Sequence, residues 1–150
     1  MKKILGKVEI DVLYIPLFIV ITVIIIEDDE NFFANYNCIL LDINKIIIGN
    51  NAMLASGVII TTADHPIHSE ARNSGWEYGK SIKIGNNVWL EAIVIINPCV
   101  TIGDIAVVGP GSVVVHDIPE NVVCVGNPAR IIKRITEDDK LFYYKKRNSM

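Results

Sequence analysis

The chain has 150 residues, which is enough for one domain with a single hydrophobic core. Its net charge of −3 provides no general basic surface, so a nucleic-acid partner is not expected. Hydrophobic residues make up 51% of the chain, with 27 Ile and 16 Val against 8 Leu. Because β-branched side chains favour strands over helices, this composition indicates an all-β protein.

Residues 1–31 include an apolar stretch that invites comparison with a membrane segment. Its apolar part, residues 12–26, is shorter than the ~20 residues that a spanning helix needs, and it contains Pro16. No cleavage site of small residues precedes the acidic residues 27–30, as a signal peptide would require. We therefore expect irregular β-coils over residues 1–31 and no membrane association.

A six-residue repeat dominates the rest of the chain. Aliphatic anchors return at every sixth position, at Ile48, Leu54, Ile60, Ile84, Leu90, Ile96, Ile102, Val108 and Val114. A second track of small or β-branched residues stands four positions after most anchors, at Ala52, Val58, Val88, Val94, Val100, Ala106 and Ser112. Each repeat then forms a short strand and a corner, and three repeats make one triangular coil of a parallel β-helix, with coils about 4.8 Å apart.

The residues between the anchors are mostly Gly, Asn, Asp and Pro, which suit tight corners. Cys99 and Ile105 occupy corner positions as well, where left-handed backbone costs a non-glycine residue ~1–2 kcal/mol. The 24 residues from Ile60 to Ile84 equal four repeats, so a loop over residues 61–83 can leave the coil and rejoin it in phase. We expect one hexapeptide-repeat domain over residues 1–150 with this loop protruding.

The end of the chain has a helical pattern. Thr136 is followed by three acidic residues, and a hydroxyl cap with acids in the first turn favours a helix start. We expect a short amphipathic helix over about residues 136–146 that closes the open end of the coil.

Cysteine and histidine spacings argue against a metal site. Cys38, Cys99 and Cys124 share no C-x-x-C spacing, which excludes a typical disulfide framework or zinc cluster and fits a reducing cytoplasm. His65 and His68 have H-x-x-H spacing, but no third ligand is evident, so no metal is expected.

Three sequence segments are not explained by the six-residue repeat alone. They are NFFANYN at residues 31–37, HPIHSEARNSG at 65–75 and GNPAR at 126–130. Together with the repeats they resemble the maltose and galactoside O-acetyltransferase family, from about Asn31 to Tyr144. The resemblance implies a left-handed β-helix and a homotrimer with active sites between subunits. It also implies direct transfer of the acetyl group of acetyl-CoA to a sugar hydroxyl, without an acyl-enzyme.

The resemblance assigns roles to single residues. His65 falls on the catalytic histidine, and Asn35 on the asparagine that orients the acceptor and stabilises the transition state. The coenzyme A groove is implied for Trp89, Ala92, Pro110, Val115, His116, Arg130 and Lys133. The chemistry needs such groups: a hydroxyl requires a base, histidine has an unperturbed pKa of about 6.5, and an amide can donate to the oxyanion.

Several positions depart from the family pattern. Ile21 stands where a serine contacts the acceptor, Ile43 where an acidic residue does, Glu91 replaces a glycine beside the groove, and His116 replaces a lysine. We also expect no counterpart of the helical segment that precedes the repeats in this family. The acceptor therefore stays open, as does the question whether these departures weaken or abolish activity.

Three alternatives remain open. The acceptor could be an antibiotic or a cell-surface sugar instead of maltose or a galactoside. The zinc carbonic anhydrases that share this fold need three histidines at a subunit interface, and the 3 His here lack that spacing. A non-catalytic β-helix that serves binding or assembly is the third.

Overall fold

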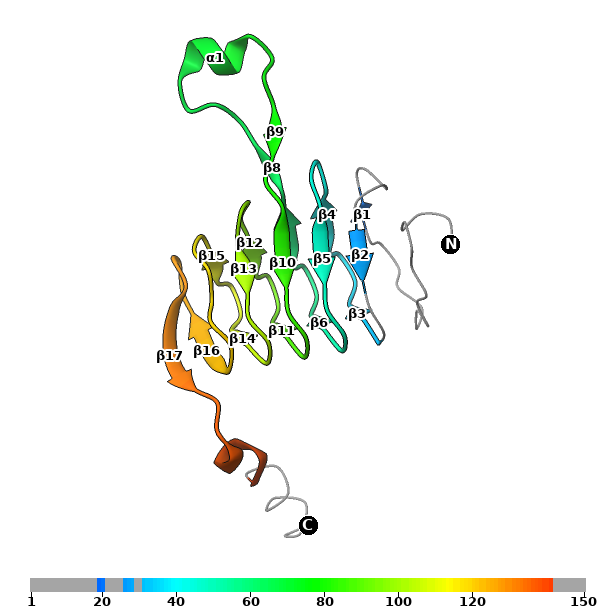
Figure 1. The fold of residues 1–150 in the computed structure, drawn as a ribbon, viewed down its shortest axis with the longest axis vertical. Coiled ribbons are helices and arrows are strands. Elements are labelled where there is room, and N and C mark those ends of the chain that lie inside the picture. Colours follow the sequence, from blue (N-terminus) through cyan, green and yellow to red (C-terminus); the bar gives the residue numbers. More distant parts are fainter. Residues whose placement is uncertain (1–18, 21–25, 29–30, 142–150) are drawn as a thin grey trace.

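The computed structural model describes residues 19–20, 26–28 and 31–141, which wind through three flat faces in turn (Figure 1). Face 1 stacks β1 (Ile19–Val20), β4 (Ile39–Leu41), β7 (Ile59–Thr61), β12 (Ile95–Ile96) and β15 (Val113–Val114). Face 2 stacks β2 (Ile26–Asp28), β5 (Ile46–Ile48), β10 (Ile82–Ile84) and β13 (Thr101–Ile102). Face 3 stacks β3 (Phe33–Ala34), β6 (Met53–Leu54), β11 (Trp89–Leu90), β14 (Val107–Val108), β16 (Val122–Val125) and β17 (Arg130–Arg134).

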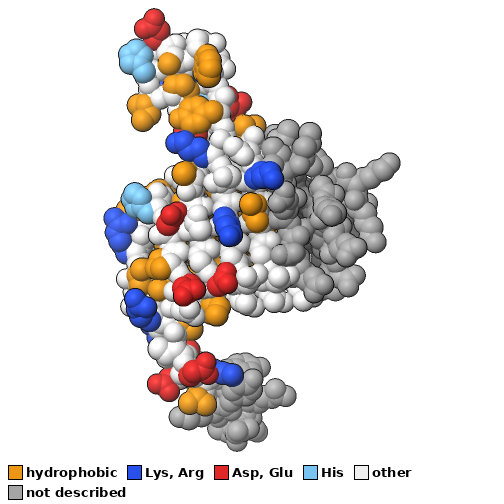
Figure 2. Space-filling view, in the orientation of Figure 1, with side chains coloured by type: hydrophobic (Ala, Val, Ile, Leu, Met, Phe, Trp, Pro, Cys, Tyr) orange, Lys and Arg blue, Asp and Glu red, His pale blue; other side chains and the backbone are white. Residues whose placement is uncertain are grey.

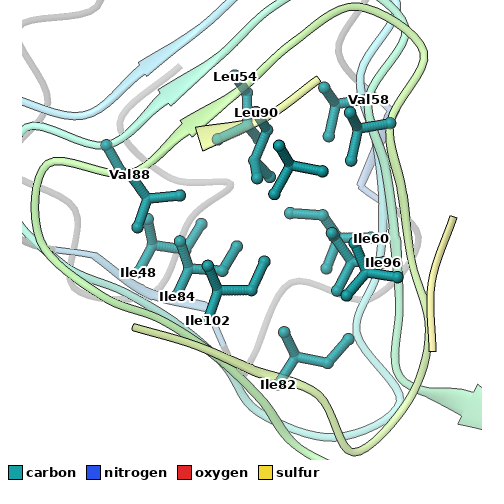
Figure 3. Packing of buried hydrophobic residues seen from close by; sticks show 14 of the residues in the cluster. Ile48, Leu54, Val58, Ile60, Ile82, Ile84, Val88, Leu90, Ile96 and Ile102 are labelled. Atoms are coloured by element: carbon teal, nitrogen blue, oxygen red, sulfur yellow. The ribbon is translucent and has the colours of Figure 1, made fainter. Parts of the chain in front are cut away.

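Parallel pairing places the predicted anchors directly above one another. The three stacks are Ile48, Ile84 and Ile102 on face 2; Leu54, Leu90 and Val108 on face 3; and Ile60, Ile96 and Val114 on face 1. All of these side chains are at most 1% exposed, and Figure 3 shows the stacks meeting inside the triangle. The prediction is confirmed: the chain is a left-handed parallel β-helix of hexapeptide repeats.

The second track is buried as well. Its aliphatic members are at most 2% exposed, and the one polar member, Ser112, is fully buried. The Ser112 hydroxyl donates to the carbonyl oxygen of Gly109 (2.6 Å) and accepts from the N–H of Gly126 (3.0 Å), so both of its hydrogen-bonding roles are satisfied. Burying each large aliphatic side chain contributes about 1.5–3 kcal/mol, which makes these stacks the main source of stability.

The corners stack as tightly as the strands. Cys99 (φ 72°) and Ile105 (φ 61°) adopt the left-handed conformation expected for them, and so does Ile93 (φ 61°), which the sequence pattern did not single out. A Cβ on Gly85 would lie 2.3 Å from Oδ1 of Asp104 in the next coil, so only glycine fits there. Two hydrogen bonds from Asn86, its backbone N–H first, hold the pKa of Asp104 below its ordinary value.

The coils before the protruding loop are longer than those after it. Strand partners such as Ile39 and Ile59 lie 20 residues apart, whereas Ile95 and Val113 lie 18 apart. The two additional residues fall within residues 42–45, between face 1 and face 2. The loop 61–83 leaves the β-helix at this same edge, one coil later.

Most of residues 1–31, where irregular coils are predicted, lie outside the described residues. The described parts, β1 and β2, pair in parallel with β4 and β5. Across the described ranges, no helix is long and apolar enough to cross a membrane.

The C-terminal end contains a strand that the sequence did not predict, followed by the first part of the predicted helix. β17 returns antiparallel along β16 and adds the last strand to face 3. Residues 137–141 are helical, and the backbone N–H of Thr136 donates to the carboxylate of Asp139 at 2.9 Å. In Figure 1 this turn lies beyond β17 and away from the coils, so it does not cover the open end. The remainder of the predicted helix, residues 142–146, lies outside the described residues.

Candidate active site

A hairpin projects from the edge between face 1 and face 2 (Figure 1). Its base is the antiparallel pair β8 (Ala63–Asp64) and β9 (Tyr78–Gly79), and its tip holds α1 (Ser69–Asn73), which the sequence analysis did not predict. Arg72 of α1 donates to two backbone carbonyl oxygens just before the helix, at 2.9 and 3.3 Å. Figure 2 shows the tip standing clear of the body, so the hairpin is exposed on several sides.

His65 follows β8, and its ring is held at one nitrogen. Nδ1 lies 3.0 Å from the backbone carbonyl oxygen of Trp76. A carbonyl oxygen can only accept, so Nδ1 carries the proton and Nε2 carries the lone pair of the neutral ring. Nε2 lies 3.7 Å from Oε1 of Glu77, and the two side chains are 52% and 45% exposed. The geometry therefore fixes the ring through Nδ1 and leaves Nε2 as the nitrogen that can contact a ligand.

Asp64 fixes the backbone of His65. Its Oδ1 accepts from the N–H of His65 at 2.9 Å, and its Oδ2 lies 3.3 Å from Nζ of Lys80, just after β9. The ammonium group of Lys80 also lies 5.4 Å from the centre of the Tyr78 ring. Partial burial raises the pKa of Asp64, but the hydrogen bonds from Lys80, His65 and Tyr78 outweigh it, and the pKa lies below its ordinary value.

This ion pair should be measurable by titration. We expect Lys80→Met to return the pKa of Asp64 toward the ordinary value of about 3.9. In the wild type the lowered pKa means that the pair stabilises the hairpin fully above that value and is lost as pH falls through the lower, folded value. Carboxylate NMR against pH measures both proteins. Asp104, whose pKa is lowered by Asn86 instead, is the control and should titrate identically in the two; an unchanged Asp64 would contradict the assignment.

Asn35 lies at the edge between face 3 and face 1 and is half-buried. Its backbone N–H donates to the carbonyl oxygen of Leu54 at 2.8 Å, and its side-chain oxygen accepts from the N–H of Tyr36 at 2.8 Å. Because the amide oxygen is used in this way, the NH₂ group is the part of the side chain that can donate to a ligand. This orientation suits the stabilisation of an oxyanion.

Two basic residues share the outer side of face 3. In the pairing of β17 with β16, Arg130 lies opposite Val125 and Lys133 lies opposite Val123, with an irregularity between them. Strand alternation would place residues three apart on opposite sides, but the bulge at Ile132 brings Arg130 and Lys133 to the same one. Trp89 is aligned with them, because Trp89, Val107, Val123 and Lys133 pair successively across the face.

Both cations already have protein partners. The guanidinium group of Arg130 donates to the carbonyl oxygen of Ala129 at 3.1 Å, and Lys133 is ion-paired with Asp139. The hydrogen bond from Lys133 lowers the pKa of Asp139. Because Lys133 and Asp139 are about half and a third exposed, solvent screens this pair, and an incoming phosphate can compete for the ammonium group.

The sequence-predicted residues fall into two groups that one chain does not bring together. Asn35, Ala92 and Pro110 lie on the edge between faces 3 and 1, with Trp89, Arg130 and Lys133 beside it on face 3. His65, Val115 and His116 lie on the edge between faces 1 and 2. Face 1 separates the two edges by roughly 15–20 Å of strand and corner.

The departures from the family pattern are distributed around both edges. Ile43 lies beside the base of the hairpin, where neighbouring Asn44 donates to the carbonyl oxygen of Gly79 at 2.8 Å. Glu91 follows β11 on the edge between faces 3 and 1 and is half-buried, His116 is exposed, and Ile21 lies outside the described residues. Cys38, Cys99 and Cys124 are unpaired thiols. Among the described residues, no group of three His, Cys, Asp or Glu side chains could hold a metal ion.

Three contacts of the site were missed at the level of sequence: those of Asp64, Trp76 and Glu77 with His65. Trp76 and Glu77 are eleven and twelve residues away, and their approach depends on the pairing of β8 with β9. One acidic residue before the histidine and another near the end of the loop were the available signal. Neither spacing matches a known motif.

The chain is similar to several known acetyltransferases. It is 47% identical over 116 residues to the galactoside O-acetyltransferase of Escherichia coli strain K12, covering 77% of this chain and 57% of that protein. It is 60% identical to a solved maltose O-acetyltransferase from Clostridium difficile 630, with a TM-score of 0.73, covering 74% of this chain and 59% of that one. A hexapeptide-repeat acetyltransferase of Vibrio cholerae O1 biovar eltor, solved with acetyl-coenzyme A, is 31% identical with a TM-score of 0.80, covering 84% and 69%.

No protein-family model matches the chain. The chain spans a little over half the length of the curated relatives that it matches. The match to the Vibrio cholerae structure nevertheless covers more than two thirds of that chain at 31% identity. The chain belongs to the maltose and galactoside O-acetyltransferase family of hexapeptide-repeat acetyltransferases.

Proposed function

We propose that this protein is an O-acetyltransferase that moves the acetyl group of acetyl-CoA directly to a hydroxyl of a sugar or sugar-like acceptor. The observation that carries the proposal is the imidazole of His65, whose Nδ1 donates to the carbonyl oxygen of Trp76 and whose Nε2 is open to a ligand. The relatives named for galactosides and maltose support a sugar acceptor. The Vibrio cholerae relative with bound acetyl-coenzyme A supports the donor.

The chemistry follows from these groups. The acceptor hydroxyl gives its proton to Nε2 of His65 while its oxygen attacks the thioester carbonyl carbon. The NH₂ group of Asn35 donates to the oxyanion of the tetrahedral intermediate. The carbon–sulfur bond then breaks, and the leaving thiolate takes the proton from the imidazolium. The products are the acetyl ester and coenzyme A, and the histidine returns to its neutral form.

The direct test is release of coenzyme A thiol from acetyl-CoA across a panel of sugars that includes maltose and galactosides. We expect thiol release that depends on the acceptor and a product ester detectable by mass spectrometry. Acetyl-CoA binding without thiol release in the presence of any sugar or antibiotic hydroxyl acceptor would favour the non-catalytic alternative instead.

The site is proposed to form between subunits of a homotrimer. Asn35 and His65 lie on different edges of face 1, so a site that uses both needs the hairpin of one chain against the other edge of its neighbour. Light scattering should give a mass of three chains of 16.7 kDa each. A stable monomer at working concentration would contradict both the assembly and the shared site.

Acetyl-CoA is proposed to lie along the same junction. Trp89, Ala92, Pro110, Arg130 and Lys133 would contribute one wall from face 3 and its edge, and Val115 and His116 of the neighbour the other. Arg130 and Lys133 provide the cations that phosphate groups favour. The unpaired thiols of the three cysteines fit a reducing cytoplasm, which we propose as the location.

Removing Arg130 should weaken the donor site specifically. We expect Arg130→Ala to raise the KM for acetyl-CoA about tenfold, the ~1.4 kcal/mol of a charge-assisted phosphate contact, and added salt to weaken wild-type binding in parallel. Steady-state kinetics against acetyl-CoA provides the measurement. Arg134→Ala is the matched control, because Arg134 lies opposite buried Val122 on the other side of β17 and should change KM little. Equal effects of the two variants would show that only net charge matters.

A further inference from the structure

The base of the hairpin presents two hydrogen-bond acceptors side by side. In the neutral form of His65, Nε2 carries the lone pair, because Nδ1 donates to the carbonyl oxygen of Trp76 at 3.0 Å. Oε1 of Glu77 lies 3.7 Å from Nε2 and belongs to an exposed carboxylate, which accepts only. A neutral imidazole and a carboxylate cannot hydrogen-bond to each other through these two acceptor atoms, so each atom can take a hydrogen bond from a ligand.

We propose that Glu77 accepts a hydrogen bond from a second hydroxyl of the acceptor, adjacent to the hydroxyl that His65 deprotonates. The acceptor class is then a polyol with hydroxyl groups in a 1,2 or 1,3 relation, as on a pyranose ring. Two such hydroxyls are separated by about one hydrogen-bond length and can donate one each to atoms 3.7 Å apart. This inference rests on the proposed function and adds a specificity-determining residue to it.

The arrangement also selects against simpler alcohols. A single hydroxyl donates to Nε2 or to Oε1, and in either case one acceptor is left without its partner once ligand has displaced water. Leaving a charged acceptor without a hydrogen bond costs binding free energy. The site therefore disfavours an alcohol with one hydroxyl because it lacks the second donor, and not because it is smaller.

Proton transfer to His65 gives the carboxylate of Glu77 a second role at the same position. When Nε2 takes the proton of the reacting hydroxyl, the ring becomes an imidazolium with the carboxylate 3.7 Å away. The same carboxylate therefore stabilises the transient cation until the leaving thiolate removes the proton. If Glu77 only stabilised the imidazolium, its removal would slow the reaction of every acceptor equally. If Glu77 also accepts a hydrogen bond from a second hydroxyl, its removal should slow only the acceptors that have that hydroxyl to the full extent.

The experiment compares kcat/KM for methyl glucopyranoside and methyl galactopyranoside with that for their monodeoxy derivatives. In the wild type, deletion of the hydroxyl next to the acetylated one should lower kcat/KM about tenfold. Glu77→Ala should lower kcat/KM for the parent glycoside by a similar factor and make the parent and that derivative equal. Glu77→Gln, which keeps an acceptor oxygen, should recover part of the difference. Glu70→Ala, in α1 of the same hairpin, is the control and should behave as wild type.

The remaining outcomes count against the inference. An unchanged penalty for the deoxy derivative in Glu77→Ala would show that another group accepts the second hydroxyl. Equal slowing of the parent and every derivative would confine Glu77 to an effect on His65. Absence of thiol release by the wild type with both glycosides and with maltose would instead refute the proposed function, and the inference with it.

Discussion

His65→Ala should lower turnover by on the order of a hundred to ten thousand fold, the usual contribution of a positioned general base. Folding and acetyl-CoA binding should be nearly unchanged, because the side chain is 52% exposed on the hairpin and contributes nothing to the aliphatic stacks. Thiol release gives the turnover, calorimetry gives the affinity for acetyl-CoA, and circular dichroism checks the fold. A variant that retains full turnover would refute the mechanism.

The neighbouring histidine provides the control for this result. His68 directly precedes α1 and makes no side-chain capping bond there, so His68→Ala should cost far less. Equal losses from the two variants would point to a damaged hairpin or a metal pair and not to a single base.

The fold could be predicted because the repeat uses only a few residue types at fixed positions. Aliphatic anchors every six positions and Gly or Asn at the corners leave no competing period, and pairing in register follows from them. The six-residue period is harder to recognise before Ile46, because the coil there is two residues longer. The additional residues lie within 42–45, where apolar and polar residues fit either frame, so only the strand registers reveal the shift.

The site could be predicted in part. His65 and Asn35 stand in recognisable strings, but the contacts that orient them use backbone groups of Trp76 and Tyr36, which have no sequence signature. Arg130 and Lys133 could be recognised as candidate cations, but their position on the same side of β17 could not be predicted. Strand alternation predicts opposite sides for residues three apart, and the bulge reverses this. Glu77 was not identified from the sequence, because its contact with His65 depends on the pairing of β8 with β9.

The separation of the candidate residues has a physical meaning for assembly. A β-helix is stiff, and each edge carries corners that stack in register, so the groups on two edges cannot approach within one chain. Residues from both edges can meet only where the edge of one chain faces the other edge of a second. Rotational symmetry provides this contact at every interface of a closed ring.

Mixing two inactive variants should therefore restore activity. Asn35→Ala removes a donor to the oxyanion, worth about 10² to 10³ in turnover, and His65→Ala removes the base. If each site takes Asn35 from one chain and His65 from its neighbour, about a quarter of the sites in a randomly mixed equimolar assembly contain both native residues. Thiol release after co-expression and joint purification with two tags should then reach about a quarter of the wild-type rate.

The decisive comparison uses a variant that carries both substitutions. Mixed with His65→Ala, the doubly substituted chain supplies no native His65 to any site, so activity should stay at the level of His65→Ala alone. Recovery in the first mixture and none in the second requires that Asn35 and His65 act across the interface. If both residues acted within one chain, no mixing ratio would produce a complete site, and the first mixture would be as inactive as its components. The shared site proposed for this protein depends on that result.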